Sequence, residues 1–165
     1  MSVVELAPVV KSVDVRRTPA DAFRLFTAQM SAWWPMKTHS RAKDAAGEVT
    51  VRIDFEGRVG GRLYETLNTG EQRDWGEVLE YEPGRRVLLS FQMGKPKEQS
   101  GEVEVRFDPL DTGHCRVTLT HSHWERMGDD AAVMRGRFAN GWEGVFVAGF
   151  ANYAGLIQRN DQGTP

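Results

Sequence analysis

Apolar residues recur every three or four positions from Asp130 to about Arg159, which is the spacing of one face of an α-helix. The residues on this stripe are Met134, Phe138, Trp142, Val145, Phe146, Phe150, Tyr153, Leu156 and Ile157. Projected at about 100° per residue, they occupy less than half of the helix circumference. We therefore predict a long amphipathic helix at this end of the chain, capped by Asp129 or Asp130. A helix this apolar needs a large surface to cover it.

The preceding part of the chain alternates apolar and polar residues with the period of half-buried β-strands. The predicted strands cover residues 9–16, 49–56, 62–67, 74–82, 86–93, 102–107 and 115–124. Between the first two, Thr18 and Pro19 begin a shorter helix. It ends near Trp33-Trp34-Pro35, because a residue before proline is pushed out of the helical region. The order is strand, helix, six strands and long helix.

Strands this short and closely spaced form an antiparallel sheet with one face toward solvent. At ~1.5 Å per residue, only the last helix is long enough to lie across the other face. The predicted fold class is α+β, in which a curved antiparallel sheet wraps around the long C-terminal helix. We expect one domain over residues 1–165, with an ordered core at about 9–158 after a loose lead-in.

Composition and charge exclude several classes of function. The net charge of −2 does not favour nucleic acid or an anionic membrane as a partner. Cys115 is the sole cysteine, so no intramolecular disulfide can form and a reducing compartment fits. The first residues carry Glu5 and no basic start, unlike a secretory signal, and no apolar run is long enough to span a membrane. We expect a cytoplasmic protein.

Several stretches match one known family. They are Trp33-Trp34-Pro35 with His39-Ser40, the run from Arg58 to Glu65, Trp75-Gly76-Glu77-Val78 continuing to Tyr81-Glu82-Pro83 and Arg86, the run from Val117 to Ser122 with Trp124-Glu125, and Gly141-Trp142. In these stretches the chain resembles the SRPBCC or START-like superfamily, and within it the bacterial branch named after the activator of heat-shock-protein-90 ATPase. The resemblance covers about residues 9–157.

This resemblance implies a helix-grip fold with a cavity between the sheet and the long helix. Relatives bind or transform apolar small molecules such as lipids, sterols, plant hormones and aromatic polyketides. The eukaryotic co-chaperones that give the branch its name carry an additional N-terminal domain with an Asn-rich, Trp-containing motif. A chain of 165 residues has no room for that domain, so the resemblance does not imply a chaperone partner.

Aromatic and small residues are the candidates for lining such a cavity. The predicted ligand-binding residues are Trp33, Trp34, His39, Tyr64, Trp75, Phe91, His121, Trp142, Phe146 and Gly149. Trp33 and Trp34 lie at the junction of the short helix and a loop, where relatives have the cavity entrance, and indoles there could stack on a flat ligand. Gly149 has two interpretations, since a glycine inside the stripe permits either close packing or the beginning of a cavity.

Three side chains could carry acid–base chemistry. Alternation places His121 and His123 on the same face as Leu119, toward the interior. With His39 they could bind zinc, but a His-x-His spacing alone does not make a site, so we predict no metal and no cofactor. The alternatives are a hydrogen bond to a backbone carbonyl or to Tyr64, or a polar contact for a ligand. Glu77 also has inward parity, unless its strand contains a bulge.

Glu77 and Cys115 also have interpretations without a functional role. Glu77 could be solvated or paired with Arg52 or Arg62, and Cys115 could be a small core residue.

The leading functional hypothesis is a carrier or sensor that binds an apolar small molecule, aromatic ones included. A second is a cyclase, dehydratase or hydrolase using His121, His123 or Glu77. A third is an interaction module, either a co-chaperone or a homodimer pairing through an edge strand at residues 62–67.

Overall fold

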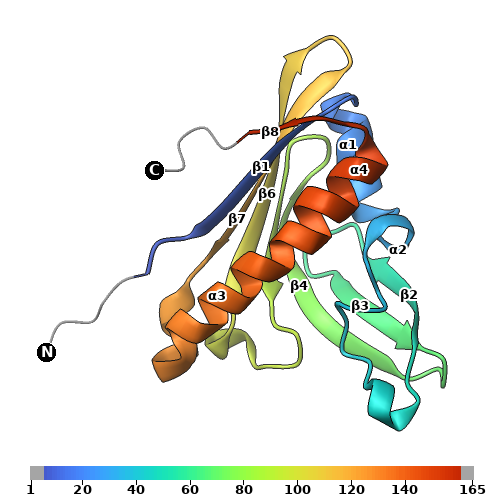
Figure 1. The fold of residues 1–165 in the computed structure, drawn as a ribbon, viewed down its shortest axis with the longest axis vertical. Coiled ribbons are helices and arrows are strands. Elements are labelled where there is room, and N and C mark those ends of the chain that lie inside the picture. Colours follow the sequence, from blue (N-terminus) through green and yellow to red (C-terminus); the bar gives the residue numbers. More distant parts are fainter. Residues whose placement is uncertain (1–5, 161–165) are drawn as a thin grey trace, which may run out of the picture.

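The computed structural model describes residues 6–160, and the predicted lead-in falls partly outside this range (Figure 1). Eight strands of the described chain form one antiparallel sheet in the order β2-β3-β4-β5-β6-β7-β1-β8. They are β1 (Val9–Val15), β2 (Thr50–Phe55), β3 (Arg62–Leu67), β4 (Gln72–Glu82), β5 (Arg86–Phe91), β6 (Gly101–Asp111), β7 (His114–Ser122) and β8 (Leu156–Arg159). The first seven agree with the predicted strands to within a few residues.

The predicted first helix is present but divided. Helix α1 (Pro19–Thr27) begins where expected, because the Thr18 hydroxyl accepts a hydrogen bond of 3.1 Å from the backbone N–H of Asp21. The helix is interrupted at Ala28, and a separate turn, α2 (Met30–Trp33), leads to Pro35. A one-turn 3-10 helix, η1 (Asp44–Ala46), lies in the connection to β2, and η2 (Lys97–Gln99) lies between β5 and β6.

The long helix has four parts. A 3-10 segment, η3 (Trp124–Asp130), precedes α3 (Ala131–Trp142), a π-helical segment η4 (Glu143–Phe150) and α4 (Ala151–Ala154). Asp130 occupies the N-cap position without a side-chain hydrogen bond. The prediction that the helix reaches Arg159 is wrong: Gly155 adopts a left-handed φ of 97°, which ends it. The following residues, Leu156 and Ile157 among them, form β8 against β1.

The long helix crosses the concave face of the sheet, and α1 and α2 cover one end of that face (Figure 1). The core lies along this seam. Phe26 of α1, for example, has its ring centroid 5.3 Å from that of Phe150 and 6.4 Å from that of Phe146. The predicted α+β architecture, a curved antiparallel sheet wrapped around a long C-terminal helix, is confirmed. One α-helical residue predicted on the apolar stripe, Tyr153, is instead 41% exposed.

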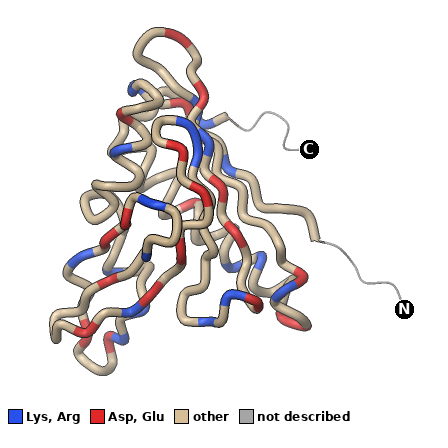
Figure 2. The backbone as a smooth tube through the Cα atoms, turned by 180° about the vertical axis from the view of Figure 1, so that it is seen from behind, with Lys and Arg blue, Asp and Glu red and all other residues tan. Residues whose placement is uncertain are grey.

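The outer face of the sheet is charged. Figure 2 shows acidic and basic residues interleaved along the strands, and several form cross-strand ion pairs, such as Arg62 with Asp74 and Arg86 with Glu104. The strand at residues 62–67 is not an edge, as the dimer hypothesis supposed, because β3 lies between β2 and β4. The two edges are β2 and β8. Over residues 6–160 no helix is long and apolar enough to cross a membrane.

Candidate functional site

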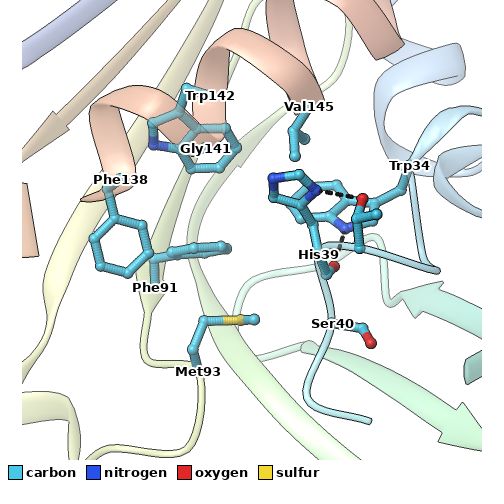
Figure 3. Close-up of a pocket in the computed structure, with 10 residues that line it drawn as sticks. Trp34, His39, Ser40, Phe91, Met93, Phe138, Gly141, Trp142 and Val145 are labelled. Carbon is cyan, nitrogen blue, oxygen red and sulfur yellow. Dashed lines mark hydrogen bonds between the residues drawn. The ribbon is translucent and has the colours of Figure 1, made fainter. Parts of the chain in front are cut away.

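A partly open cavity of about 160 Å³ lies where the long helix, the end of β5 and the loop after α2 meet (Figure 3). It is lined by Trp34, Thr38, His39, Ser40, Phe91, Met93, Phe138, Gly141, Trp142 and Val145. The polar groups of Thr38, His39 and Ser40 are together on the loop, and the remaining walls are mostly apolar. An apolar cavity with a few polar groups on one side is the usual form of a small-molecule site.

Hydrogen bonds fix the loop that forms one wall of the cavity. The indole N–H of Trp34 donates to the backbone carbonyl of His39 at 2.6 Å, and the hydroxyl of Thr38 lies 2.8 Å from Nδ1 of His39 (Figure 3). The imidazole lies against the long helix at two glycines. A Cβ added at Gly141 or Gly144 would lie 3.9 or 3.6 Å from the ring, in ordinary contact. The loop and helix therefore approach closely at His39.

A buried carboxylate holds the same loop from behind. Glu65 on β3 is fully buried, and Oε1 accepts hydrogen bonds from the backbone N–H of Arg41 at 2.7 Å and from Nε1 of Trp75 at 2.8 Å. Its other oxygen accepts a short hydrogen bond from the hydroxyl of Thr50. Trp75 in turn packs against Trp34, with ring centroids 4.8 Å apart. Glu65 therefore joins the loop to the tryptophans of the cavity wall.

Sequence reasoning missed Glu65, although its signal was present. Leu63, Glu65 and Leu67 alternate with Arg62, Tyr64 and Thr66, and the three with odd numbers are buried. The same alternation places Tyr64 on the opposite face. There its ring lies under the guanidinium of Arg62, at 4.1 Å, rather than near the cavity. Tyr64 therefore neither lines this cavity nor bonds a histidine within it.

His121 is a neutral, fully buried imidazole behind the cavity. Its Nδ1 accepts a hydrogen bond of 3.0 Å from Nε1 of Trp142, so the ring proton is on Nε2. Burial lowers the pKa of His121 to about 3. Nε2 and the indole nitrogen of Trp124 are buried and have no hydrogen-bond partner among the described residues. His121 therefore fixes the orientation of Trp142, which lines the cavity.

The other predicted ligand-binding residues are divided between the cavity and the core behind it. Trp34, His39, Phe91 and Trp142 line the cavity. The remaining ones that face inward, Trp33, Trp75, His121 and Phe146, are buried without lining it. Trp33 is turned toward α1, where its indole N–H donates to the carbonyl of Leu25 at 2.8 Å. The lining residues that were not predicted are Thr38, Ser40, Met93, Phe138, Gly141 and Val145, although Phe138 and Val145 lie on the predicted helical stripe.

Gly149 marks close packing and does not begin a cavity. A Cβ at this position would lie 3.1 Å from the carbonyl oxygen of Trp33 and 3.6 Å from Cδ of Pro35. The first of these distances is tighter than a normal contact, so a larger side chain would push the end of α2 away. Of the two interpretations of this glycine, close packing holds, and the element packed against it is the end of α2.

Glu77 faces outward because β4 contains a bulge. The register between β3 and β4 shifts between Leu63 and Tyr64, opposite Trp75 and Gly76. A Cβ on Gly76 would lie 1.9 Å from the carbonyl oxygen of Ser90, so only glycine fits there. After this shift Glu77 points away from the core. It forms an ion pair of 2.6 Å with Lys97, rather than with either predicted arginine.

His123 also faces solvent, although the alternation of the strand predicted that it points toward the interior. Its backbone adopts a left-handed φ of 66°, just after β7 ends, so the alternation of the strand no longer applies. The imidazole lies near Glu102 and Glu125 and is 42% exposed. The three predicted acid–base residues are thus not brought together.

The remaining sequence candidates have structural roles or lie apart. Cys115 is buried as expected, and burial raises the pKa of its thiol to about 12. His39, at the cavity, and His123, at the surface, do not converge on His121, which is enclosed by aromatic rings. Within residues 6–160 no three His, Cys, Asp or Glu side chains are grouped as metal ligands.

A curved antiparallel sheet gripping a long C-terminal helix, with a cavity at their seam, defines the helix-grip class of proteins. Residues 16–155 match the family model described as activator of Hsp90 ATPase homolog 1-like protein. The chain therefore belongs to this family. No curated protein matches it.

Solved structures extend this comparison. One is the anthrahydroquino-gamma-pyrone synthase Txn09 complexed with SUM. It is 31% identical, with a TM-score of 0.62 over 90% of this chain and 97% of that one. The self-sacrificing resistance protein CalC from Micromonospora echinospora is 23% identical, with a TM-score of 0.66 over 92% and 98%. An Hsp90 activator from Plasmodium falciparum is 18% identical, with a TM-score of 0.59 over 94% and 100%. The last two likenesses concern the fold alone.

Proposed function

We propose that the protein binds an apolar aromatic small molecule in the cavity lined by Trp34, Phe91 and Trp142. The observation that carries this proposal is the composition of the walls. Aromatic rings form most of the apolar sides, and the polar groups of Thr38, His39 and Ser40 are confined to one side. The 31% identity with an anthrahydroquino-gamma-pyrone synthase, an enzyme named for a polycyclic aromatic product, supports an aromatic ligand.

The size of the cavity limits what it encloses. An engineered apolar cavity of about 150 Å³ binds benzene, so a cavity of about 160 Å³ encloses one ring. A larger flat ligand would insert one edge and leave the remainder at the open side. The enclosed ring would lie among Phe91, Trp142 and Trp34, in contact with rings that favour edge-to-face and offset-stacked arrangements.

Fluorescence titration tests this proposal directly. Indole, 2-naphthol and anthraquinone are added to the protein, and quenching of tryptophan emission gives a dissociation constant for each. Replacing Val145 with Phe fills the cavity and should weaken binding about tenfold or more. Val133→Phe changes an exposed position on the same helix and should leave binding unaltered. If none of the three compounds binds, or if Val145→Phe has no effect, the proposal fails.

Catalysis on a bound aromatic ligand is a second candidate, favoured by the same similarity to a synthase. His39 is the imidazole in the cavity lining, and an imidazole can either donate or accept a proton. It would act as the acid or base, since Glu77 and His123 face solvent. The test is mass spectrometry of a bound ligand incubated with wild-type protein and with His39→Asn. Loss of conversion with binding retained would support catalysis, and an unchanged ligand in both would exclude it for that ligand.

A further inference from the structure

A second, smaller cavity adjoins the first. It measures about 70 Å³ and is lined by Phe91, Gln92, Met93, Lys95, Gln99, Ser100, Met127, Met134 and Phe138. Phe91, Met93 and Phe138 line both cavities, so these three side chains form the partition between them. Figure 3 shows Phe91, Phe138 and Met93 side by side at the edge of the first cavity.

The partition has one fixed part and one adaptable part. Phe91 is 4% exposed and its ring contacts those of His121, Trp142 and Phe138. Met93 and Phe138 are only partly buried. A methionine side chain is unbranched and fills irregular spaces, and two further methionines, Met127 and Met134, face the second cavity. A ligand could therefore pass beside Met93 without disturbing the core around Phe91.

The backbone of Met93 is held in an unusual conformation. Its φ is 48°, in the left-handed region that non-glycine residues rarely adopt. Two hydrogen bonds to the carbonyl of Trp75, from the N–H groups of Gln92 and Met93 at 2.7 and 2.9 Å, hold the turn in place. Such strained residues are concentrated at ligand clamps. Here the turn directs the Met93 side chain to the boundary between the two cavities.

The charges at the two cavities have one sign. None of the described residues that line either cavity is acidic, and Lys95 lines the second one. Lys95 forms no ion pair within the described chain, whereas Lys97, two residues away, is paired with Glu77. The guanidinium of Arg41 also lies close to Gly94, next to Met93. An anionic group at the second cavity would therefore find uncompensated positive charge.

We propose that the site continues past Met93 into the second cavity, and that its ligand is an aromatic compound with a short side chain ending in a carboxylate. The ring occupies the first cavity, the side chain passes beside Met93, and the carboxylate meets Lys95. This inference rests on the proposed function, and it adds the shape and charge of the ligand.

Three probes of one ring separate these properties. They are 4-phenylbutyrate, whose side chain ends in a carboxylate, 4-phenylbutan-1-ol, whose side chain has the same length but is neutral, and ethylbenzene, whose side chain is short. Isothermal titration calorimetry should show 4-phenylbutyrate binding about tenfold more tightly than ethylbenzene. Met134→Trp and Met127→Trp, which fill the second cavity from two different elements, should remove this preference and leave ethylbenzene binding within about twofold. Val133→Trp, at an exposed position of the same helix, is the control.

Charge is tested separately. Lys95→Gln should weaken 4-phenylbutyrate about threefold, which is the size expected of a solvent-exposed pair, and leave the neutral alcohol unchanged. Lys97→Gln is the matched control. Equal binding of 4-phenylbutyrate and ethylbenzene to wild type, or equal weakening of both by the two filling variants, would overturn the inference while leaving the proposed function intact. No binding of any probe would overturn both.

Discussion

The two ends of the seam between the long helix and the sheet are built from similar aromatic residues but are packed differently. At one end, Phe146 and Phe150 stack with ring centroids 5.6 Å apart and planes within 3° of each other, and Phe26 packs against both. All three are fully buried or nearly so. At the other end, Phe138 is only partly buried and Trp142 borders a cavity. We call these the closed end and the open end.

The difference lies in what faces the long helix across the seam. At the closed end the facing elements are α1 and α2, and Phe26 and Trp33 from them pack against Phe150 of the long helix. At the open end the facing element is the loop at residues 36–41, whose backbone groups need partners from elsewhere. It obtains them from Trp34 and Glu65, among others. A cavity therefore persists where a loop takes the place of a helix.

The largest expected effect breaks the closed end. Phe146→Ala should lower the free energy of unfolding by about 3–5 kcal/mol, because it leaves a void among packed rings. Phe138→Ala, at the open end of the same helix, should cost about 1–2 kcal/mol, since this side chain is partly exposed and gives up less buried surface. Urea denaturation of both variants measures the difference. Equal losses would mean that the two ends are equally well packed.

The next effect concerns the pH dependence of the open end. The pKa of His121 is about 3 in the folded protein against an ordinary value of 6.5, so the unfolded chain takes up a proton that the folded protein does not. Stability is therefore unaffected above pH 6.5 and falls from there toward pH 3, by about 3 kcal/mol at pH 4.5. His121→Phe should remove this part of the pH dependence.

The control for this prediction is His123→Asn. His123 lies at the surface with a positive φ, which asparagine tolerates, and this variant should keep the wild-type pH profile. The profiles are compared by urea denaturation at pH 7 and 4.5. His121→Phe should also lose about 1–3 kcal/mol at pH 7, because the indole N–H of Trp142 loses its acceptor. A wild-type slope in His121→Phe would show that carboxylates alone cause the acid sensitivity.

The smallest expected effect is a local loosening of the loop at residues 36–41 that leaves the core at α1 unchanged. In Glu65→Gln, Oε1 can still accept from Arg41 and Trp75, but both hydrogen bonds lose the strength that a charged acceptor gives. The expected loss of stability is about 1–2 kcal/mol, with faster hydrogen exchange at the Arg41 amide and unchanged exchange in α1. Glu104→Gln, at a pair on the outer face, should cost less than about 0.5 kcal/mol. Uniformly faster exchange would contradict a local role for Glu65.

Although β8 was predicted as the end of the helix, alternation predicted the other seven strands, because their inner face is buried over much of its length. It failed where the backbone departs from regular geometry. The bulge beside Gly76 turns Glu77 outward, and a glycine inside a strand is a recognisable sign of a bulge. Nothing in the sequence marks the left-handed backbone at His123 in the same way, because a histidine does not require this conformation.

The site was predicted less completely than the fold. Aromatic residues on the inner face could all be expected to point inward, but the sequence does not distinguish those that line a space from those that fill it. Phe146 and Trp142 occupy the same stripe four residues apart, and only Trp142 borders the cavity. That distinction depends on how closely α2 and the loop approach the helix, which is set by tertiary contacts such as that of Glu65 with Arg41.

Strand β8 has a consequence for how a molecule could enter the protein. Because β8 pairs with β1, and Glu143 bridges Lys11 of β1 and Arg159 of β8, the helix is fastened to the sheet edge from its midpoint onward. Ahead of that point α3 has Trp142 as its buried residue and follows a kink at Gly128. We therefore expect exchange of the proposed ligand to require a motion of α3, while the second half of the helix stays in place.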